Sequence, residues 1–271
     1  MPTALHRERL IRIVQSRQNA RVKELRAAFT RAVRTESGLL AIEGEHLIGE
    51  ALASGLEPAT VFVQNGSESL LDHLGIPQNT EVLALPREIF ASAVHTESPQ
   101  GIAALVRPRQ FTLDEVLARP SPLILVAVGL QDPGNLGTLI RSAEAFGATG
   151  YLTLSGTVSL DNQKTLRASA GSIFRLPGLS IGEDHLFHEL HRRKIKTIAA
   201  VASHGEPLTQ HDLTQPTAIL IGNEGSGIPS EILRRVDARV TIPTPGPVES
   251  LNAAVAGSIL LYEAARKRAN R

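Results

Sequence analysis

Several residue types are missing or scarce in this chain of 271 residues, and each absence excludes something. No cysteine is present, which excludes disulfides, thiolate metal sites and a cysteine nucleophile, and suits a cytoplasmic protein. Tryptophan is absent and aromatics make up 3% of the chain, so aromatic stacking platforms for single-stranded nucleic acid are not expected. No apolar run reaches the roughly 18–20 residues of a membrane helix, and arginines interrupt residues 1–26, so we expect neither a membrane span nor a signal peptide.

The net charge of +1 conceals a basic segment at one end. Residues 1–34 carry nine Arg and Lys against two Glu, a local balance of +7. Such a segment favours a polyanion partner, because each neutralised phosphate releases counterions. A solvated helix face explains the arginines equally well, so the segment alone leaves both interpretations open.

Strand and helix patterns alternate twice along the chain, which predicts an α/β architecture. The first series contains helices at 17–35 and 45–55 and strands at 38–44, 60–65, 81–86 and 101–107. A polar, proline-containing stretch then suggests a linker at 108–121 between domains at 1–107 and 122–271. The second series begins with the apolar run 123–130, typical of a buried parallel strand. It continues with helices at 134–148, 165–177, 184–195, 230–236 and 250–269 and strands at 150–154, 196–203, 216–225 and 238–243.

Three loops of the second series follow strands, where parallel α/β sheets bind ligands. In "QDPGNLGTLIRSAEAFG" we expect Asn135 to cap a helix that carries Arg141 two turns further on; a solvent-exposed arginine is the simpler alternative. In "ILIGNEGSGIPSEIL" the glycines match neither a Rossmann fingerprint nor a P-loop. Glu224 in that loop either anchors backbone N–H groups or faces a ligand. In "IPTPGPVESLNAAVAGSILLYEA" we expect Ser250 to cap the closing helix, with Asn252 in its first turn.

In this order and spacing the three loops resemble the three motifs of the SpoU (TrmH-type) RNA ribose 2′-O-methyltransferases, over about residues 123–268. "SRQNARVKELR" and "LLAIEGEHLIGEAL" are similar to the openings of the substrate-binding domain that many members carry. The resemblance implies a C-terminal α/β-knot domain, a trefoil-knotted, mostly parallel sheet, and a smaller ribosomal-protein-like N-terminal RNA-binding domain. It further implies S-adenosylmethionine as cofactor, no metal, a homodimer, and methylation of a ribose 2′-hydroxyl in structured RNA, with 23S ribosomal RNA favoured over tRNA.

Site residues carry over from the motifs as what the resemblance implies. The catalytic positions are Asn135, Arg141, Glu224, Ser250 and Asn252. The cofactor-binding positions are Val201, Ala202, Gly222, Ile242 and Leu251. The RNA-binding positions are Arg167, Arg21 and Lys23. Because an arginine stays protonated, we expect Arg141 to orient the phosphate and stabilise the developing alkoxide, with Asn135 and Glu224 positioning it. The rivals are a family member that binds RNA without methylating it and a Rossmann-type oxidoreductase.

Overall fold

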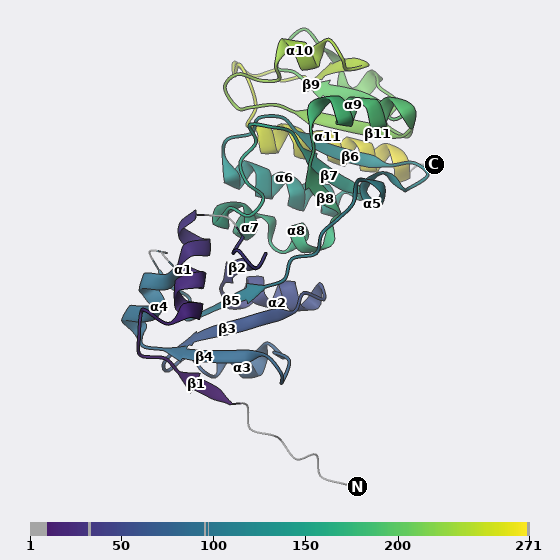
Figure 1. The fold of residues 1–271 in the computed structure, drawn as a ribbon. Coiled ribbons are helices and arrows are strands. Elements are labelled where there is room, and N and C mark those ends of the chain that lie inside the picture. The colour runs from purple at the N-terminus through teal and green to yellow at the C-terminus, as the bar shows by residue number, and fades with distance from the viewer. Residues whose placement is uncertain (1–9, 32–33, 95, 97, 270–271) are drawn as a thin grey trace. The chain divides into compact units, whose positions relative to one another are not determined.

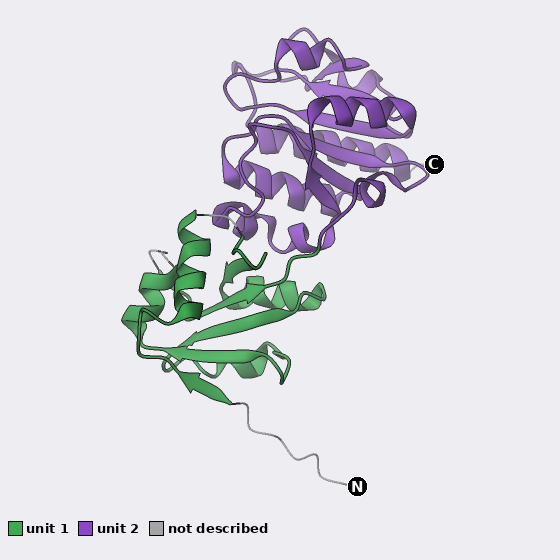
Figure 2. Cartoon of the chain, viewed as in Figure 1, with its two compact units in different colours: residues 1–109 green, residues 110–271 purple. Residues whose placement is uncertain are grey.

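The computed structural model describes residues 10–31, 34–94, 96 and 98–269. The chain divides into two compact units, Met1–Arg109 and Gln110–Arg271 (Figure 2). Residues of the predicted linker at 108–121 fall in both units, and 113–117 form a helix, α5 (Leu113–Leu117), with Val116 and Leu117 buried in the second unit. Thr112 and Glu115 cap each other's backbone at the start of α5, so this stretch is ordered by local capping and by core contacts.

The first unit is a five-stranded sheet with helices packed on it (Figure 1). Its elements are β1 (Ile11–Ile13), α1 (Ala20–Arg31), β2 (Leu40–Glu43), α2 (Glu45–Ala53), β3 (Pro58–Gln64), α3 (Leu70–His73), β4 (Glu81–Leu85), α4 (Arg87–Val94) and β5 (Ile102–Val106). The strand order is β1-β4-β3-β5-β2, and β5 is antiparallel to both of its neighbours. Val22, Leu25 and Phe29 follow helical spacing on α1 and bury that face in the core of the unit.

The second unit is a parallel sheet of seven strands with helices on both faces (Figure 1). The elements after α5 are β6 (Leu123–Ala127), α6 (Pro133–Ala145), β7 (Gly150–Thr153), α7 (Gln163–Ser169), α8 (Ser172–Arg175), β8 (Gly178–Ser180), α9 (Glu183–Arg192), β9 (Lys196–Ala200), β10 (Glu206–Pro207), η1 (Leu208–Gln210), β11 (Thr217–Ile221), α10 (Ser230–Leu233), β12 (Ala238–Thr241) and α11 (Ala253–Ala269). The strand order is β10-β12-β9-β11-β6-β7-β8.

Burial on both faces explains why the central strands read as continuous apolar runs. Every residue of β6 and β11 is buried, since one core cluster packs against α6 and α11 and another against α5, α9 and α10. Because all seven strands are parallel, the loops after β6, β9, β11 and β12 emerge at the same edge of the sheet. This edge therefore brings together the three motif loops.

One predicted helix is divided in two. The helix expected at 165–177 ends at Ser169, and α8 starts at Ser172. Between them Ala170 (φ 47°) and Gly171 (φ 84°) adopt left-handed backbone conformations, which end a helix turn. The apolar spacing continues across the break, which is why the sequence pattern did not reveal it.

Candidate active site

The loop after β6 is organised by Asp132 rather than by Asn135. Asp132 is the N-cap of α6, and its Oδ1 accepts a hydrogen bond from the Asn135 backbone N–H at 2.8 Å. The expectation that Asn135 caps the helix is wrong, because Pro133 occupies the first helical turn and moves the cap one residue before it. Lys164 donates to the other oxygen of Asp132, and this bond, with that from Asn135, lowers the pKa of the Asp132 carboxyl. The Asn135 side chain is thereby left available for other contacts.

The loop after β11 is organised by Asn223. Its Oδ1 accepts hydrogen bonds from the backbone N–H groups of Gly225 and Ser226, at 2.9 and 3.0 Å. Gly222 allows the loop to fold back on itself, since a Cβ there would lie 2.5 Å from the Gly227 carbonyl carbon. Asn223, and not Glu224, therefore binds the backbone of this loop.

At the start of α11, Asn252 takes the capping role that we expected of Ser250. The helix begins at Ala253, and Asn252 Oδ1 accepts from the backbone N–H groups of Ala254 and Val255 at 2.9 and 3.2 Å. Ser250 lies two residues before the cap, too far from the first turn to bind it, and lines a cavity instead.

A chain of hydrogen bonds joins the three motif loops. Asn252 Nδ2 donates to Asn135 Oδ1 at 3.1 Å, and Asn135 Nδ2 donates to Glu224 Oε1 at 2.8 Å. The backbone of α11 occupies Asn252 Oδ1, so the amide of Asn252 can only donate to Asn135, and Asn135 in turn can only donate to Glu224. The chain thus holds a carboxylate in a fixed orientation. In the part of the chain that the structure describes, the second oxygen of Glu224 has no protein partner and can accept a hydrogen bond from a ligand.

Beside this chain lies a cavity of about 380 Å³, within the roughly 300–1,000 Å³ that is usual for ligand pockets. Its walls come from the loops after β9, β11 and β12 and from the start of α11. All five residues that we expected to bind the cofactor line it, namely Val201, Ala202, Gly222, Ile242 and Leu251. Both apolar and polar residues line these walls, which suits a ligand that has an aromatic base and polar ends.

The expected arginines lie apart from the hydrogen-bonded chain. Arg141 is exposed on α6 and, among the described residues, bonds to neither Asn135 nor Glu224, so the structure does not show the positioning that we expected for it. Arg167 is exposed in the last turn of α7.

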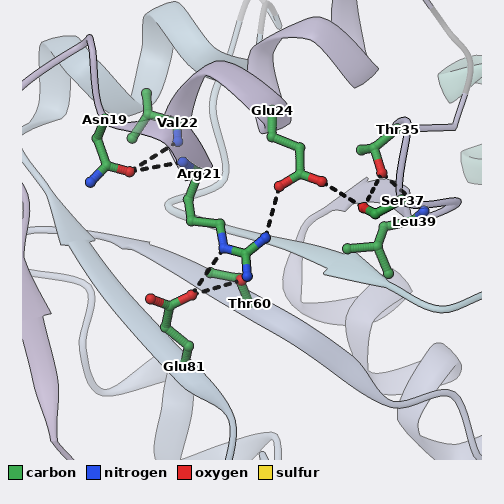
Figure 3. A network of polar contacts seen from close by, with 9 residues as sticks. All are labelled: Asn19, Arg21, Val22, Glu24, Thr35, Ser37, Leu39, Thr60 and Glu81. Atoms are coloured by element: carbon green, nitrogen blue, oxygen red, sulfur yellow. Dashed lines mark hydrogen bonds and ion pairs between the residues drawn. The ribbon is translucent and has the colours of Figure 1, made fainter.

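Arg21 and Lys23, the remaining expected RNA-binding residues, differ in their surroundings. Arg21 bridges two carboxylates, Glu24 at 2.9 Å and Glu81 at 3.3 Å, as Figure 3 shows. Glu24 also accepts from Ser37, so the network connects α1, β4 and the turn before β2. Lys23 points away from the core and is exposed.

Sequence reasoning missed several residues of the site. Asp132 carries a recognisable signal, because an aspartate directly before a proline is a common way to begin a helix. Thr244 and Glu249 line the cavity but follow no pattern that marks them. Among the residues that the structure describes, no group of three or more His, Asp or Glu side chains could hold a metal ion. Over the same residues, no helix has both the length and the apolar character needed to cross a bilayer.

Comparison with known proteins agrees with the motifs. Residues 122–262 match the model of the SpoU rRNA Methylase family, and residues 19–104 match the MRM3-like substrate binding domain. The chain is 33% identical over 253 residues to the 23S rRNA (guanosine(2553)-2'-O)-methyltransferase RlmP of Bacillus subtilis, covering 92% of this chain and 97% of that protein. It is 31% identical over 262 residues to the 23S rRNA (uridine(2479)-2'-O)-methyltransferase of Streptomyces viridochromogenes, covering 93% and 91%.

Solved structures agree as well. The SpoU methyltransferase AviRb from Streptomyces viridochromogenes, in complex with the cofactor AdoMet, superposes with a TM-score of 0.79 at 28% identity, covering 93% of this chain and 100% of that one. An rRNA methyltransferase from Sinorhizobium meliloti gives a TM-score of 0.82 at 27% identity, covering 94% and 98%. These matches confirm the α/β fold class with its N-terminal substrate-binding domain, and the chain belongs to the SpoU rRNA methylase family.

Proposed function

We propose that this protein transfers a methyl group from S-adenosylmethionine to a ribose 2′-hydroxyl of 23S ribosomal RNA. The observation that carries the proposal is the chain Asn252–Asn135–Glu224 at the rim of a cavity of cofactor size. The relatives named above act on 23S rRNA, and AviRb is described with AdoMet bound.

The cofactor, when bound, supplies an electrophilic methyl group on a sulfonium centre. Val201, Ile242 and Leu251 offer apolar contacts to it, and the backbone around Gly222 offers hydrogen-bonding groups. Glu224 accepts a hydrogen bond from the 2′-hydroxyl on its free oxygen, which aligns the attacking lone pair, and it takes the proton that the hydroxyl loses on methylation. Arg141 holds the neighbouring phosphate and balances the charge that develops on the ribose oxygen, since a guanidinium remains protonated and cannot serve as the base. Ser250, on the cavity wall, binds the ribose or the cofactor through its hydroxyl.

RNA contacts are proposed for residues of both units. Residues 1–107 form the substrate-binding domain and residues 122–271 the catalytic domain. Lys23 and Arg167 are exposed cations that can bind phosphate. Arg21 contributes indirectly, because its charge is already balanced by Glu24 and Glu81. A separate substrate-binding domain suits a large structured RNA, which favours ribosomal RNA over tRNA.

The surface formed by α6 and α11 supports the proposal of a homodimer. A shallow, mainly apolar groove between these helices is lined by Phe146, Val255, Ile259 and Tyr262. Val255 and Tyr262 are 49% and 55% exposed, which is high for side chains of this size. Asn135 and Asn252 line the same groove, so a second copy seated there would border the active site and could meet Arg141. We further propose that the catalytic domain carries the trefoil knot that the resemblance implies, and that the protein acts on ribosomal RNA in the cytoplasm.

An in vitro assay tests the proposed function. The protein and tritiated S-adenosylmethionine are incubated with unmodified 23S rRNA or with unmodified tRNA, and digests are searched for 2′-O-methylated nucleosides. We expect label in one nucleoside of 23S rRNA. Label in tRNA alone would contradict the substrate, and absence of cofactor binding by calorimetry would contradict the enzymatic function. Glu224→Gln is the matched control for the role of the Glu224 carboxylate, because it keeps the shape of the site while weakening the acceptor.

A further inference from the structure

Asn223 lies between Gly222 and Glu224 of the candidate site, and its side chain bonds to the backbone on two sides. Its side chain is bonded at both ends. At one end, Oδ1 accepts from the backbone N–H groups of Gly225 and Ser226 and, at 3.2 Å, from the Ser226 hydroxyl. The backbone N–H and C=O of Asn223 also pair with Gly227, both at 3.0 Å. These bonds close the loop after β11 into a tight turn that forms one wall of the cavity.

The other end of the side chain reaches a different loop. Asn223 Nδ2 donates to the carbonyl oxygen of Gly129 at 3.0 Å. Gly129 follows β6 and has a φ of +66°, and its own N–H is held by the Thr157 hydroxyl. Three residues further on, Asp132 begins the helix that carries Asn135. One amide therefore connects the loop that presents Glu224 with the loop that presents Asn135.

We propose that Asn223 is a positioning residue for methyl transfer: it fixes the two loops relative to each other so that Asn135 holds Glu224 toward the ribose. The inference rests on the proposed function. The Asn135–Glu224 bond is a single contact of 2.8 Å between exposed side chains, and such a bond alone does not hold two loops in register. Asn223 adds a bond from its side chain to the backbone of the neighbouring loop, and that side chain is itself held by three other hydrogen bonds.

Only asparagine meets both requirements at this position. Two backbone N–H groups need an acceptor and one carbonyl needs a donor, at opposite ends of a short side chain. Aspartate has the same shape and keeps the acceptor, but it replaces the donor by a second acceptor that faces the Gly129 carbonyl. Alanine removes both. The two variants therefore separate the folding of the loop from its connection to the neighbouring loop.

The test compares Asn223→Asp and Asn223→Ala with the wild-type protein in three measurements. These are the Kd for S-adenosylmethionine by calorimetry, kcat and KM on unmodified 23S rRNA, and the melting temperature. For Asn223→Asp we expect the Kd for the cofactor to stay within about threefold while kcat falls roughly tenfold to a hundredfold. For Asn223→Ala we expect the Kd to rise roughly tenfold as well, because the cavity wall loses its internal bonds.

A double variant distinguishes positioning from a general loss of structure. If Asn223 acts through Glu224, Asn223→Asp should lower kcat much less in a Glu224→Gln background than in the wild type. A full loss of kcat in that background, or wild-type kcat in Asn223→Asp alone, would overturn the proposal. Thr112→Ala, which removes the side-chain cap of α5, is the control for ordinary loss of a capping residue and should leave the ratio of kcat to KM nearly unchanged.

Failure of the proposed function would give results different from failure of the Asn223 inference. If the wild type binds S-adenosylmethionine but labels no RNA, the methylation target is wrong, and the effect of Asn223→Ala on the Kd still decides whether Asn223 shapes the cavity. An unchanged Kd in that variant would overturn the inference.

Discussion

Arg21 and Lys23 stand two positions apart on α1, yet their surroundings differ. Arg21 donates to Glu24 and Glu81, and the bond to Glu24 is the main reason that the pKa of its guanidinium is raised. Burial raises the pKa of Glu24, but bonds from Ser37 and Arg21 outweigh it and leave that pKa below its ordinary value. A residue so engaged supports the fold of its unit, whereas the exposed ammonium of Lys23 is available to a phosphate.

Paired substitutions should separate these roles. We expect Arg21→Gln to lower the melting temperature by about 1–3 °C, since a partly exposed ion pair contributes up to about 1 kcal/mol. Lys23→Gln should leave the melting temperature unchanged and reduce the salt dependence of RNA binding by about one phosphate contact. Thermal unfolding and RNA binding at several salt concentrations check both. A larger change of salt dependence in Arg21→Gln than in Lys23→Gln would show that Arg21 contacts the RNA directly.

A second prediction at the residue scale concerns Arg141. If its guanidinium holds a phosphate through two parallel hydrogen bonds, a lysine of equal charge cannot replace it. We expect Arg141→Lys to lower kcat on 23S rRNA roughly 10²–10³-fold, the usual cost of losing a charge-stabilising donor. The Kd for S-adenosylmethionine should stay unchanged, because Arg141 does not line the cavity. Near-normal turnover would mean that charge alone suffices.

The sequence indicated which side chains lie together at this end of the sheet better than which contacts each one makes. Asn135, Glu224 and Asn252 do meet, and Ser250 does line the cavity. The roles differ because capping depends on which backbone N–H groups lie within reach. The cap moves by three residues, from Asn135 to Asp132, in α6, and by two residues, from Ser250 to Asn252, in α11.

At the scale of elements, the start of α6 connects stability with the site. The Asp132 carboxylate caps α6 and pairs with Lys164 on α7, and both bonds lower its pKa. A carboxyl group whose pKa is lower in the folded than in the unfolded chain stabilises the fold above its unfolded pKa of about 3.9. That contribution is lost as the pH falls through the folded pKa.

Asp132→Asn and Asp132→Ala test this reasoning. Asparagine keeps the acceptor for the Asn135 N–H but removes the charge, so we expect a cost of about 0.5 kcal/mol at pH 7 that begins to shrink near pH 4 and is lost as the pH falls through the lowered pKa of Asp132. Alanine also removes the cap and should cost about 1–2 kcal/mol at pH 7, with part of the cost remaining at low pH. Melting temperatures of the wild type and the two variants, measured at several values from about pH 3 to about pH 8, provide the comparison. A cost of Asp132→Asn that grows toward low pH would contradict the assigned sign.

Elements with a clear apolar pattern could be predicted from the sequence, and the shortest edge strands could not. The helix at α6 and the buried strands β6 and β11 follow clear apolar patterns and lie within a few residues of their expected positions. The strands β1, β8 and β10 contain three residues or fewer and lie at sheet edges, where partial exposure weakens any pattern. The division between α7 and α8 depends on two left-handed residues, one of them an alanine, which no propensity predicts.

At the scale of the whole molecule, the alternation of strands and helices predicted two α/β parts, and the chain does form two compact units. Hydrophobic pattern decides which face of an element is buried, but it carries no information on how segments thread past each other. For that reason the trefoil knot rests on the resemblance alone. The same holds for the dimer, since an exposed apolar residue in a sequence has the same appearance as a buried one.

The groove between α6 and α11 makes the dimer testable. Tyr262 packs edge-on against Phe146, with ring centroids 5.6 Å apart, and remains 55% exposed. If a second copy covers this surface, Tyr262→Glu places a charge in an apolar contact and should convert the dimer to a monomer while the chain stays folded. Light scattering coupled to size exclusion measures the mass, with Leu10→Glu, a substitution of an equally apolar exposed residue in the first unit, as the matched control.

Activity should follow the oligomeric state, because Asn135 and Asn252 line both the groove and the hydrogen-bonded chain at the cavity. We expect the Tyr262→Glu monomer to keep its melting temperature within a few degrees and to lose methyl transfer to 23S rRNA, while the Leu10→Glu protein remains dimeric and active. A monomeric but fully active Tyr262→Glu protein would show that each chain forms a complete site alone. A dimer that persists in Tyr262→Glu would place the interface on another surface, and Arg141 would then have to reach the ribose within its own chain.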